Sequence, residues 1–281
     1  MSYKIISVHV NGSRHGFKRI ALAVRIAMDF EAHLVGVASA GLPRSYFSAG
    51  LTGEGALGMS MYLNFVKEQA AASLAVFEST ADKAGMRSFE KCLIEEEAGD
   101  ALCLRARYSD LLVLGQTDAE EDIPAERNDI PGHVVLNAGR PVLLIPHAGA
   151  FDTLGQRVMI AWDGSVEAAR AVTGAIPFLR TAQQVQVVVF NPATGLHAHG
   201  EEPGADIALY LARHGVNVDV SAQHTGDEID TGNAILSHAC DFGADLLVTG
   251  AYGHARFREV LLGGVTQTIL RAMTVPVLMS H

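Results

Sequence analysis

Cysteine and long apolar runs are scarce in this sequence. The three cysteines, Cys92, Cys103 and Cys240, have no metal-ligand spacing and cannot all pair, which predicts a reducing, cytoplasmic location. They also lack a neighbouring base or a C-x-x-C partner, so redox chemistry is not expected. No apolar run approaches the length that crosses a bilayer, and the first ten residues, MSYKIISVHV, predict a strand and not a signal peptide. No membrane partner is therefore expected.

Positive charge is also in deficit. Lysine and arginine number 21 against 31 aspartates and glutamates, for a net charge of −10. This balance argues against general affinity for nucleic acid, which is a polyanion. It does not exclude a nucleotide, which a few local donors can hold. With 49% hydrophobic and 19% charged residues, the 281-residue chain is typical of a soluble globular protein with two domains.

The sequence contains an internal repeat. Three pairs of segments match: 110–115 with 245–250, 140–144 with 275–279, and 8–13 with 160–165. The first two pairs share an offset of 135 residues (245 − 110), and the third has an offset of 152 (160 − 8), so the first copy carries about 17 additional residues. Two domains are predicted, at 1–147 and 157–281, with the linker at 148–156.

The additional residues of the first copy are placed at 41–60, a stretch rich in glycine and serine. Such a stretch is typical of a mobile surface loop, and a lid or a partner-docking loop is the alternative.

Strand-like apolar runs alternate with helical stretches in both copies. In the second copy strands are predicted at 157–162, 185–190, 216–222, 246–249 and 275–279, with helices from 166, at 205–214, at 232–241 and at 266–272. The first copy follows the same order, with a longer second helix at 61–83. The runs are apolar throughout, which indicates parallel strands covered by helices on both faces. The expected fold is α/β, with two tandem doubly wound domains.

In such a sheet ligands bind beyond the carboxyl ends of the strands, where the strand order reverses. If the order is 3-2-1-4-5, the reversal lies between the first and fourth strands. In the second copy the loops after these strands begin at Asp163 and Gly250.

The loop after Gly250 has the composition of a phosphate site. Gly250 and Gly253 are followed by nine residues, and then a helix opens at Gly263-Gly264-Val265-Thr266. Glycines allow close backbone approach, and a helix N-terminus attracts anions. Arg256 and Arg258 add positive charge, and Asp163 is placed to accept from a ribose hydroxyl or the adenine edge. The alternative is that these are turn glycines only.

This pattern, Gly250-x2-Gly253-x9-Gly263 with Asp163-Gly164-Ser165 after the first strand, resembles the universal stress protein family. The resemblance covers both copies. It implies five parallel strands in each domain in the order 3-2-1-4-5, ATP or a related adenine nucleotide with or without Mg²⁺, and dimer-like pairing of domains.

The resemblance also implies roles for individual residues. Asp163 would contact the adenosine, flanked by Ala161 and Trp162, while Val189 and Phe190 would line the adenine pocket. The remaining implied contacts are Gly250 and Gly253 near the ribose and α-phosphate, and Gly263 and Gly264 around the outer phosphates, with Arg256, Val265 and Thr266 close by. Gly264 departs from the family, which usually has Ser or Thr there, and the lost hydroxyl weakens binding by roughly 1 kcal/mol.

The first copy lacks these features. Asn11 stands in place of Asp163, and Asp118, Asn128 and Asp129 stand in place of Gly253, Gly263 and Gly264. The loop from 118 to 129 has six acidic residues against Arg127 alone, so it is expected to repel a triphosphate. A divalent-metal site made from these acids is the alternative to a solvated acidic loop.

The remaining candidate metal-binding, phosphate-binding and catalytic residues give weaker indications of a site. His197 and His199 form an H-x-H pair that is more often incidental than metal-binding, and His254 could either meet a phosphate or face solvent. Ser165 is most simply a helix N-cap. No nucleophile, base and orienting group occur together, so an enzyme is not expected beyond slow ATP hydrolysis or self-phosphorylation.

The sequence therefore favours a stress-response regulator or scaffold that binds one adenine nucleotide per chain in the second copy. The apolar segments 142–145 and 275–279 are expected to pair edge to edge between copies, and a homodimer is a further expectation. Two rivals stay open: a nucleotide-independent interaction module, and an adenylyl-transfer enzyme of a related superfamily.

Overall fold

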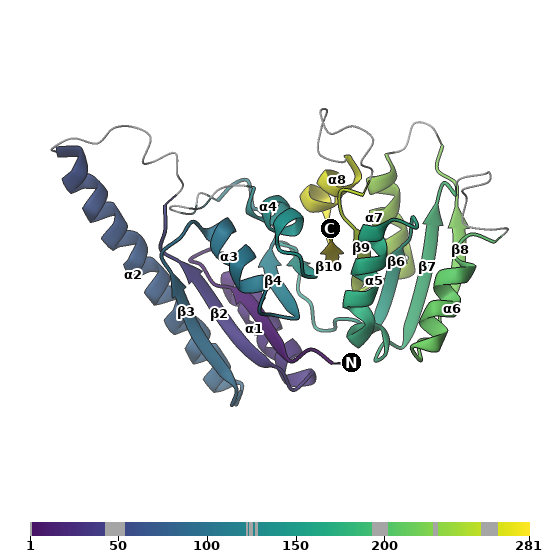
Figure 1. Cartoon of the computed structure of the whole chain (residues 1–281), viewed down its shortest axis with the longest axis horizontal. Coiled ribbons are helices and arrows are strands. Elements are labelled where there is room, and N and C mark those ends of the chain that lie inside the picture. Colours follow the sequence, from purple (N-terminus) through teal and green to yellow (C-terminus); the bar gives the residue numbers. More distant parts are fainter. Residues whose placement is uncertain are drawn as a thin grey trace. The chain divides into compact units, whose positions relative to one another are not determined.

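The chain divides into two compact units, Ser2–Arg140 and Pro141–His281, in the computed structural model of the protein. The structure describes residues 2–42, 54–121, 123, 126, 129–192, 202–226, 230–253 and 264–281. Both units have the α/β architecture that the alternating pattern predicts (Figure 1).

The first unit is a four-stranded parallel sheet with helices on both faces. Its elements are β1 (Ile5–His9), α1 (Gly16–Asp29), β2 (His33–Ser39), α2 (Glu54–Lys83), β3 (Phe89–Ile94), α3 (Ala98–Ala106), β4 (Leu111–Gly115) and α4 (Ile130–Asn137). The strand order is β3-β2-β1-β4, and Ile6 of β1 lies opposite both Leu34 and Leu111. Helices α1 and α2 contact each other, as do α3 and α4.

The second unit has six strands. Its elements are β5 (Val142–Ile145), β6 (Arg157–Ala161), α5 (Val166–Leu179), β7 (Gln184–Phe190), α6 (Ala205–Arg213), β8 (Asp219–Gln223), α7 (Thr231–Phe242), β9 (Leu246–Gly250), α8 (Gly264–Ala272) and β10 (Val277–Ser280). The strand order is β5-β10-β9-β6-β7-β8. From β8 to β10 this is the predicted order 3-2-1-4-5.

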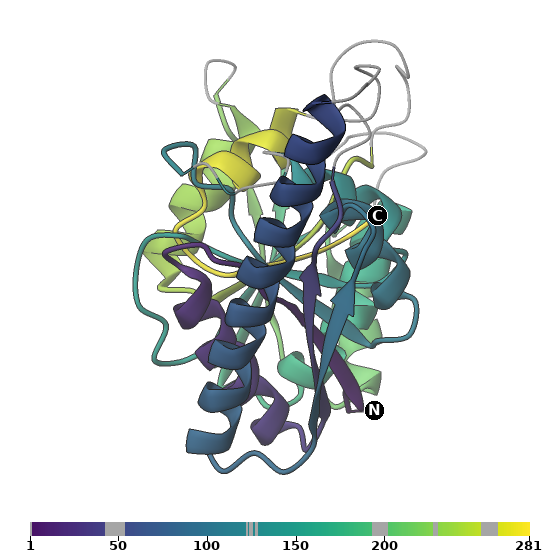
Figure 2. The same cartoon turned by 90° about the vertical axis from the view of Figure 1, so that its left-hand side faces the viewer.

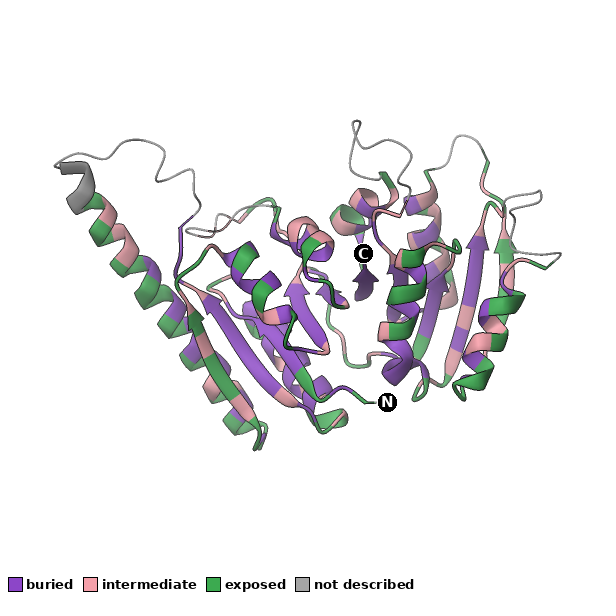
Figure 3. Cartoon of the chain, in the orientation of Figure 1, coloured by how far each residue is buried: buried purple, intermediate pink, exposed green. Residues whose placement is uncertain are grey.

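Strand β5 belongs to the first copy of the repeat but groups with the second unit. It pairs antiparallel with β10, with Leu143 opposite Leu278. Every residue of both strands is buried, and β10 is purple beside the C-terminus in Figure 3, so each strand covers the edge of the other. The predicted pairing of these segments is observed, whereas the division into two five-stranded sheets is not: the compact units hold four and six strands. The domain limits 1–147 and 157–281 follow the repeat and stay a prediction.

The buried face of α2 shows why the first unit holds so long a helix. Val66, Ala70, Leu74, Phe77 and Ala81 are buried and recur at intervals of three or four residues, which places them on one side of the helix. Helix α2, in the foreground of Figure 2, has 30 residues and spans about 45 Å. It begins seven residues before the predicted start, and residues 43–53 of the predicted insertion at 41–60 lie outside the described residues.

The predicted strand at 216–222 forms later, at Asp219. The reason is the end of α6: Gly215 has a positive φ of 77°, and the N–H of Val216 donates to the carbonyl of Leu211 at 3.0 Å. That N–H closes the helix, so it does not serve the ladder with β7. Among the helices that the structure describes, none combines the length and apolar character needed to cross a membrane.

Candidate functional site

The carboxyl ends of β6 and β9 lie side by side in the second unit. The two strands are parallel neighbours, with Ala161 opposite Thr249. From β6 the chain crosses to β7 and β8 on one side and then returns to β9 on the other, so the strand order reverses between β6 and β9. The loops that begin at Asp163 and Gly250 therefore start next to each other, at the position where ligands bind in doubly wound sheets.

Asp163 organises the turn that starts α5. Its Oδ1 accepts from the N–H of Ser165 at 2.9 Å, across Gly164, whose φ is 74°. Ser165 then caps the helix, because its Oγ accepts from the N–H of Ala168 at 3.0 Å. Asp163 is exposed, so its carboxylate is available to a ligand while it holds the turn.

The glycines after β9 lie against the first turn of α5. A Cβ on Gly250 would come within 2.6 Å of the Ala168 nitrogen, and one on Gly253 within 2.9 Å of the Glu167 carboxylate. Helix packing alone thus accounts for glycine at 250. The roles of both glycines toward ribose and phosphate stay predictions.

Tyr252 is a residue that the sequence patterns missed. It adopts a positive φ of 61°, and its N–H donates to the Thr266 hydroxyl at 3.1 Å. Thr266 is buried on α8, so this bond fastens the loop after β9 to the start of that helix. Burial raises the pKa of the Tyr252 phenol. Tyrosine is not a residue type that patterns associate with positive φ, so no local signal marked it.

The first turn of α8 is open at Gly264. This exposed residue begins the helix, and a Cβ placed on it would meet nothing within 4 Å. Val265 follows it, half-buried. Arg256 and Gly263, together with Arg258 and His254, lie outside the described residues, as do His197 and His199.

The residues predicted to line the adenine pocket differ in how far they are buried. Trp162 is half-buried, and its backbone N–H donates to the Val188 carbonyl at 2.9 Å. Val189 is only 1% exposed and belongs to the core. The Phe190 ring meets the His238 ring edge to face, with centroids 6.0 Å apart, toward α7. Trp162 is therefore better placed than Val189 to meet a ligand.

At the equivalent corner of the first unit, the chain's own side chains form a hydrogen-bonded network. Buried Arg19 takes the position of Ala171 in the repeat; its Nε donates to the His9 carbonyl at 2.8 Å and its Nη2 to Asn11 Oδ1 at 2.7 Å. Asn11 Nδ2 donates to Glu126 Oε2 at 2.9 Å, and His9 Nε2 lies 3.2 Å from Glu126 Oε1. Burial by itself would raise the pKa of Glu126, but His9, Asn11 and Arg19 outweigh it, and the pKa is lowered.

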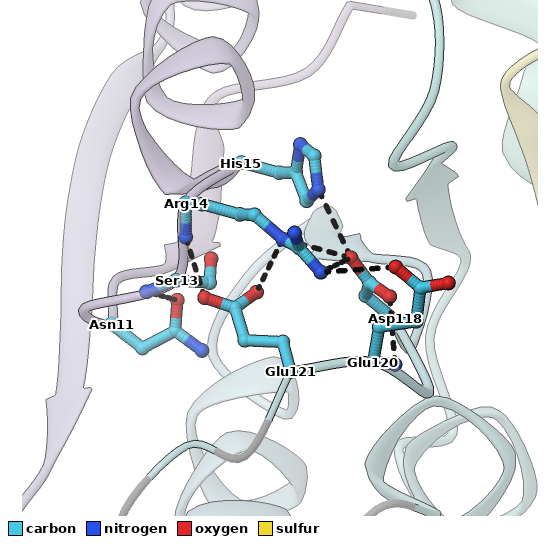
Figure 4. Close-up of polar contacts among 7 residues, drawn as sticks. All are labelled: Asn11, Ser13, Arg14, His15, Asp118, Glu120 and Glu121. Carbon is cyan, nitrogen blue, oxygen red and sulfur yellow. Dashed lines mark hydrogen bonds and ion pairs between the residues drawn. The ribbon is translucent and has the colours of Figure 1, made fainter.

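Further acids of this loop are paired at the start of α1 (Figure 4). Arg14 Nη2 lies 2.7 Å from Asp118 Oδ2, and the Arg14 N–H donates to Glu121 Oε1 at 2.7 Å. His15 Nε2 lies 3.2 Å from the same Asp118 oxygen. Within the loop from 118 to 129, the sequence offers Arg127 as the one basic residue to balance six acidic residues. The structure adds the basic side chains of Arg14 and His15, which lie just before α1 and over 100 positions away in the chain.

The cluster of His15, Asp118 and Glu121 has the donor atoms of a metal site, all within 4.8 Å of one another. The Arg14 guanidinium already contacts this cluster. A cation supplied by the chain therefore stands where the predicted alternative, a divalent metal, would bind.

The second unit is similar to a known protein family. Residues 155–281 match the universal stress protein family. The matched stretch contains β6 to β10, both loops of the candidate site and the reversal of strand order. No protein of curated function matches the sequence.

Two solved structures share the fold of this chain over nearly its whole length. A crystal structure from Archaeoglobus fulgidus DSM 4304 aligns over 98% of this chain and 94% of its own, with a TM-score of 0.73 at 15% identity. A putative universal stress protein from Pseudomonas aeruginosa UCBPP-PA14 aligns over 98% and 92%, with a TM-score of 0.57 at 13% identity. An Archaeoglobus fulgidus universal stress protein in complex with dAMP aligns over 52% of this chain and 98% of its own, with a TM-score of 0.35 at 20% identity.

Proposed function

We propose that the universal stress domain at 157–281 binds one adenine nucleotide, ATP, with or without Mg²⁺, and that the chain is a nucleotide-responsive regulator or scaffold. The observation that carries this proposal is the juxtaposition of Asp163 with the loop from Gly250 to Gly253 at the reversal of strand order. An exposed carboxylate and a close-packed glycine loop there suit a ribose and a phosphate chain. The family match at 155–281 supports the same assignment.

The first unit, in this proposal, serves stability and pairing and does not bind ATP. Two carboxylates, Glu121 and Glu126, line the corner that corresponds to the nucleotide site. A triphosphate there would meet like charge at close range, and it would have to displace the ion pairs of Arg14. Cytoplasmic location, pairing of the two domains and a homodimer are parts of the proposal.

The direct experiment is a titration of the full chain with Mg-ATP, followed by the fluorescence of Trp162, the single tryptophan, and by calorimetry. We expect saturable binding with one site per chain. Asp163→Ala removes both the carboxylate and the acceptor of the turn, whereas Asp163→Asn keeps the acceptor. A loss of at least tenfold in affinity in both variants would assign the effect to the charge. Asp219→Asn, an exposed carboxylate at the opposite end of the sheet, is the matched control.

A second variant tests the loop after β9. Gly253→Asp introduces the residue of the first copy and brings its side chain next to the Glu167 carboxylate, so we expect binding to be lost. Gly58→Asp, at an exposed position of α2 where a Cβ meets nothing within 4 Å, adds the same charge in the first unit and should leave binding unchanged. Absence of any saturable change with wild-type protein at millimolar Mg-ATP would contradict the proposal.

The alternative function is a nucleotide-independent interaction module. Two observations favour it: Gly264 offers no hydroxyl to a phosphate, and the Glu167 carboxylate faces the position of Gly253. It predicts that Mg-ATP changes neither Trp162 fluorescence nor thermal stability. An adenylyl-transfer activity would require a product of α-phosphate cleavage, which the same samples can be assayed for.

A further inference from the structure

His281, the residue that follows β10, contacts the loop after β9. Its Nδ1 lies 3.1 Å from the Ala251 carbonyl oxygen, and its ring meets the Tyr252 ring edge to face, with centroids 6.3 Å apart. A carbonyl oxygen only accepts, so Nδ1 carries the proton and donates it. The sheet brings His281 to this position, because the parallel pairing of β9 and β10 continues in a bond from the Ala251 N–H to the Ser280 carbonyl at 3.0 Å.

The backbone of the loop after β9 requires support at two residues. Tyr252 has a φ of 61°, in the left-handed region that a tyrosine adopts only where its surroundings hold it. Ala251 is buried, so its carbonyl requires a donor. His281 supplies that donor, and the Thr266 hydroxyl accepts from the Tyr252 N–H at 3.1 Å. Side chains from beyond β10 and from α8 thus hold the backbone between Gly250 and Gly253.

The first copy lacks both supporting side chains. At the predicted repeat offset of 135 residues, Pro146 takes the position of His281 (281 − 135) and Pro131 takes that of Thr266 (266 − 135). A proline side chain neither donates nor accepts a hydrogen bond, so neither contact can form there. The two side chains that hold the loop are therefore present in the copy proposed to bind a nucleotide and absent from the other.

We propose that His281 is a positioning residue of the nucleotide site. It holds Ala251 and Tyr252, so that the glycines on either side of them, Gly250 and Gly253, keep the geometry that a nucleotide meets. This inference rests on the proposed binding of an adenine nucleotide by the second unit.

The His281 bond affects binding through the conformation of the loop. Without it, the buried Ala251 carbonyl has lost its donor, and the Tyr252 backbone is free to leave the left-handed region. A nucleotide then binds only the fraction of molecules whose loop is in place, and the affinity falls by that fraction.

The test compares His281→Leu, which removes the donor, with His281→Asn, whose amide restores a donor near the position of Nδ1. We expect the affinity of the full chain for Mg-ATP, measured by calorimetry, to fall at least about fivefold in His281→Leu, as for the loss of one hydrogen bond. In His281→Asn the affinity should stay within about twofold of the wild type.

His214→Leu is the matched control. His214 is exposed at the end of α6, before β8, and its ring also meets a tyrosine, Tyr210, with centroids 4.5 Å apart. It lies at the amino end of the neighbouring strand, away from the loop after β9, so this variant should leave the affinity for Mg-ATP unchanged.

Hydrogen exchange gives a second readout that requires no nucleotide. The Tyr252 N–H, which donates to Thr266, should exchange at least about fivefold faster in His281→Leu than in the wild type or His281→Asn, while the amides of β6 keep their protection. Equal loss of protection at Tyr252 and throughout β6 would mean that His281 supports the whole unit, which would contradict a role confined to the loop.

The outcomes separate this inference from the proposed function. Mg-ATP binding by the wild type, with equal affinity in His281→Leu, would overturn the inference and leave the proposed function standing. Equal losses in His281→Leu and His281→Asn would also overturn it, because the hydrogen bond would then not be the cause. Absence of binding by the wild type would overturn the proposed function itself, and the inference with it.

Discussion

Asp163 and Asn11 occupy the same position of the repeat, and their surroundings differ. Asp163 is exposed and bonds only the backbone of its own turn in the contacts described above. Asn11 is enclosed by Arg19 and Glu126, which use both its amide oxygen and its amide nitrogen. The exposed Asp163 carboxylate can therefore contact a ligand, whereas the Asn11 amide is already hydrogen-bonded to Arg19 and Glu126.

Gly264 offers the most direct change in nucleotide affinity. Gly264→Ser restores a hydroxyl at the first turn of α8, where a side chain meets no obstacle. We expect the affinity for Mg-ATP to rise about fivefold, which corresponds to about 1 kcal/mol for one added hydrogen bond. Calorimetry of Gly264→Ser against Gly264→Ala separates the hydroxyl from the helix propensity of the new residue. An equal rise in both variants would contradict a hydroxyl–phosphate contact.

Arg19 and Arg14 give a matched pair for stability. Arg19→Met removes a buried guanidinium from the half-buried Asn11 and Glu126, so we expect the free energy of unfolding to fall by about 3 kcal/mol. Arg14 is half-exposed, and Arg14→Met should lower it by less than about 1 kcal/mol. Urea unfolding followed by circular dichroism compares the two. Similar losses of unfolding free energy in the two variants would mean that the Arg19 contacts stabilise the protein no more than the Arg14 ion pairs do.

The lowered pKa of Glu126 predicts how the stability that this network contributes depends on pH. Its pKa is lowered in the folded protein, so its stabilising contribution is complete above the ordinary value of 4.5 and is lost as pH falls through the folded value. The difference in unfolding free energy between the wild type and Glu126→Gln should therefore be largest near neutral pH and shrink below about pH 4.5. A difference that stays constant from pH 7 to pH 3 would exclude this linkage.

At the scale of elements, equivalent helices of the two copies begin differently. Both copies have the Asx contact, from Ser165 N–H to Asp163 and from Ser13 N–H to Asn11 at 3.3 Å, but α5 has a serine cap, whereas His15 makes no side-chain cap bond at the start of α1. The loop after the fourth strand also contacts the start of this helix differently in the two copies. In the second unit Gly250 and Gly253 lie against the capped turn, and in the first unit an acidic side chain pairs with Arg14, just before α1.

The two serines before these helices test the caps. Ser165→Ala removes the acceptor for Ala168 and should lower the free energy of unfolding by about 1 kcal/mol. Ser13 takes the equivalent position, but its buried hydroxyl has no hydrogen-bond partner among the residues that the structure describes, so Ser13→Ala should change stability by less than about 0.5 kcal/mol. Urea midpoints at equal m-values measure both. A loss in Ser13→Ala as large as in Ser165→Ala would contradict the assignment of the caps.

For the whole molecule, the placement of β5 decides how the chain divides. The strand is part of the first copy in sequence, yet it covers β10 in the second unit. The universal stress domain matched at 155–281 therefore ends in a strand whose outer edge is covered by a segment that precedes the match.

Two fragments test this division. Residues 141–281 keep β5 and should be folded and monomeric at low concentration. Residues 155–281 expose the edge of the fully buried β10, so they should self-associate or aggregate. Light scattering after size exclusion distinguishes the two. A well-behaved monomer of 155–281 would show that β5 is dispensable for the second unit.

The sequence by itself determined the positions of most strands, and it predicted the duplication and a candidate site after β6 and β9. Apolar runs and glycine spacing are local patterns, and they mark strands and loops without knowledge of the fold. Only the tertiary structure decided which unit holds β5 and which cations meet the acidic loop. Arg14 and Asp118 are 104 positions apart, and no local pattern links them. Parallel strand pairing brings them together, because it aligns the carboxyl ends of β1 and β4.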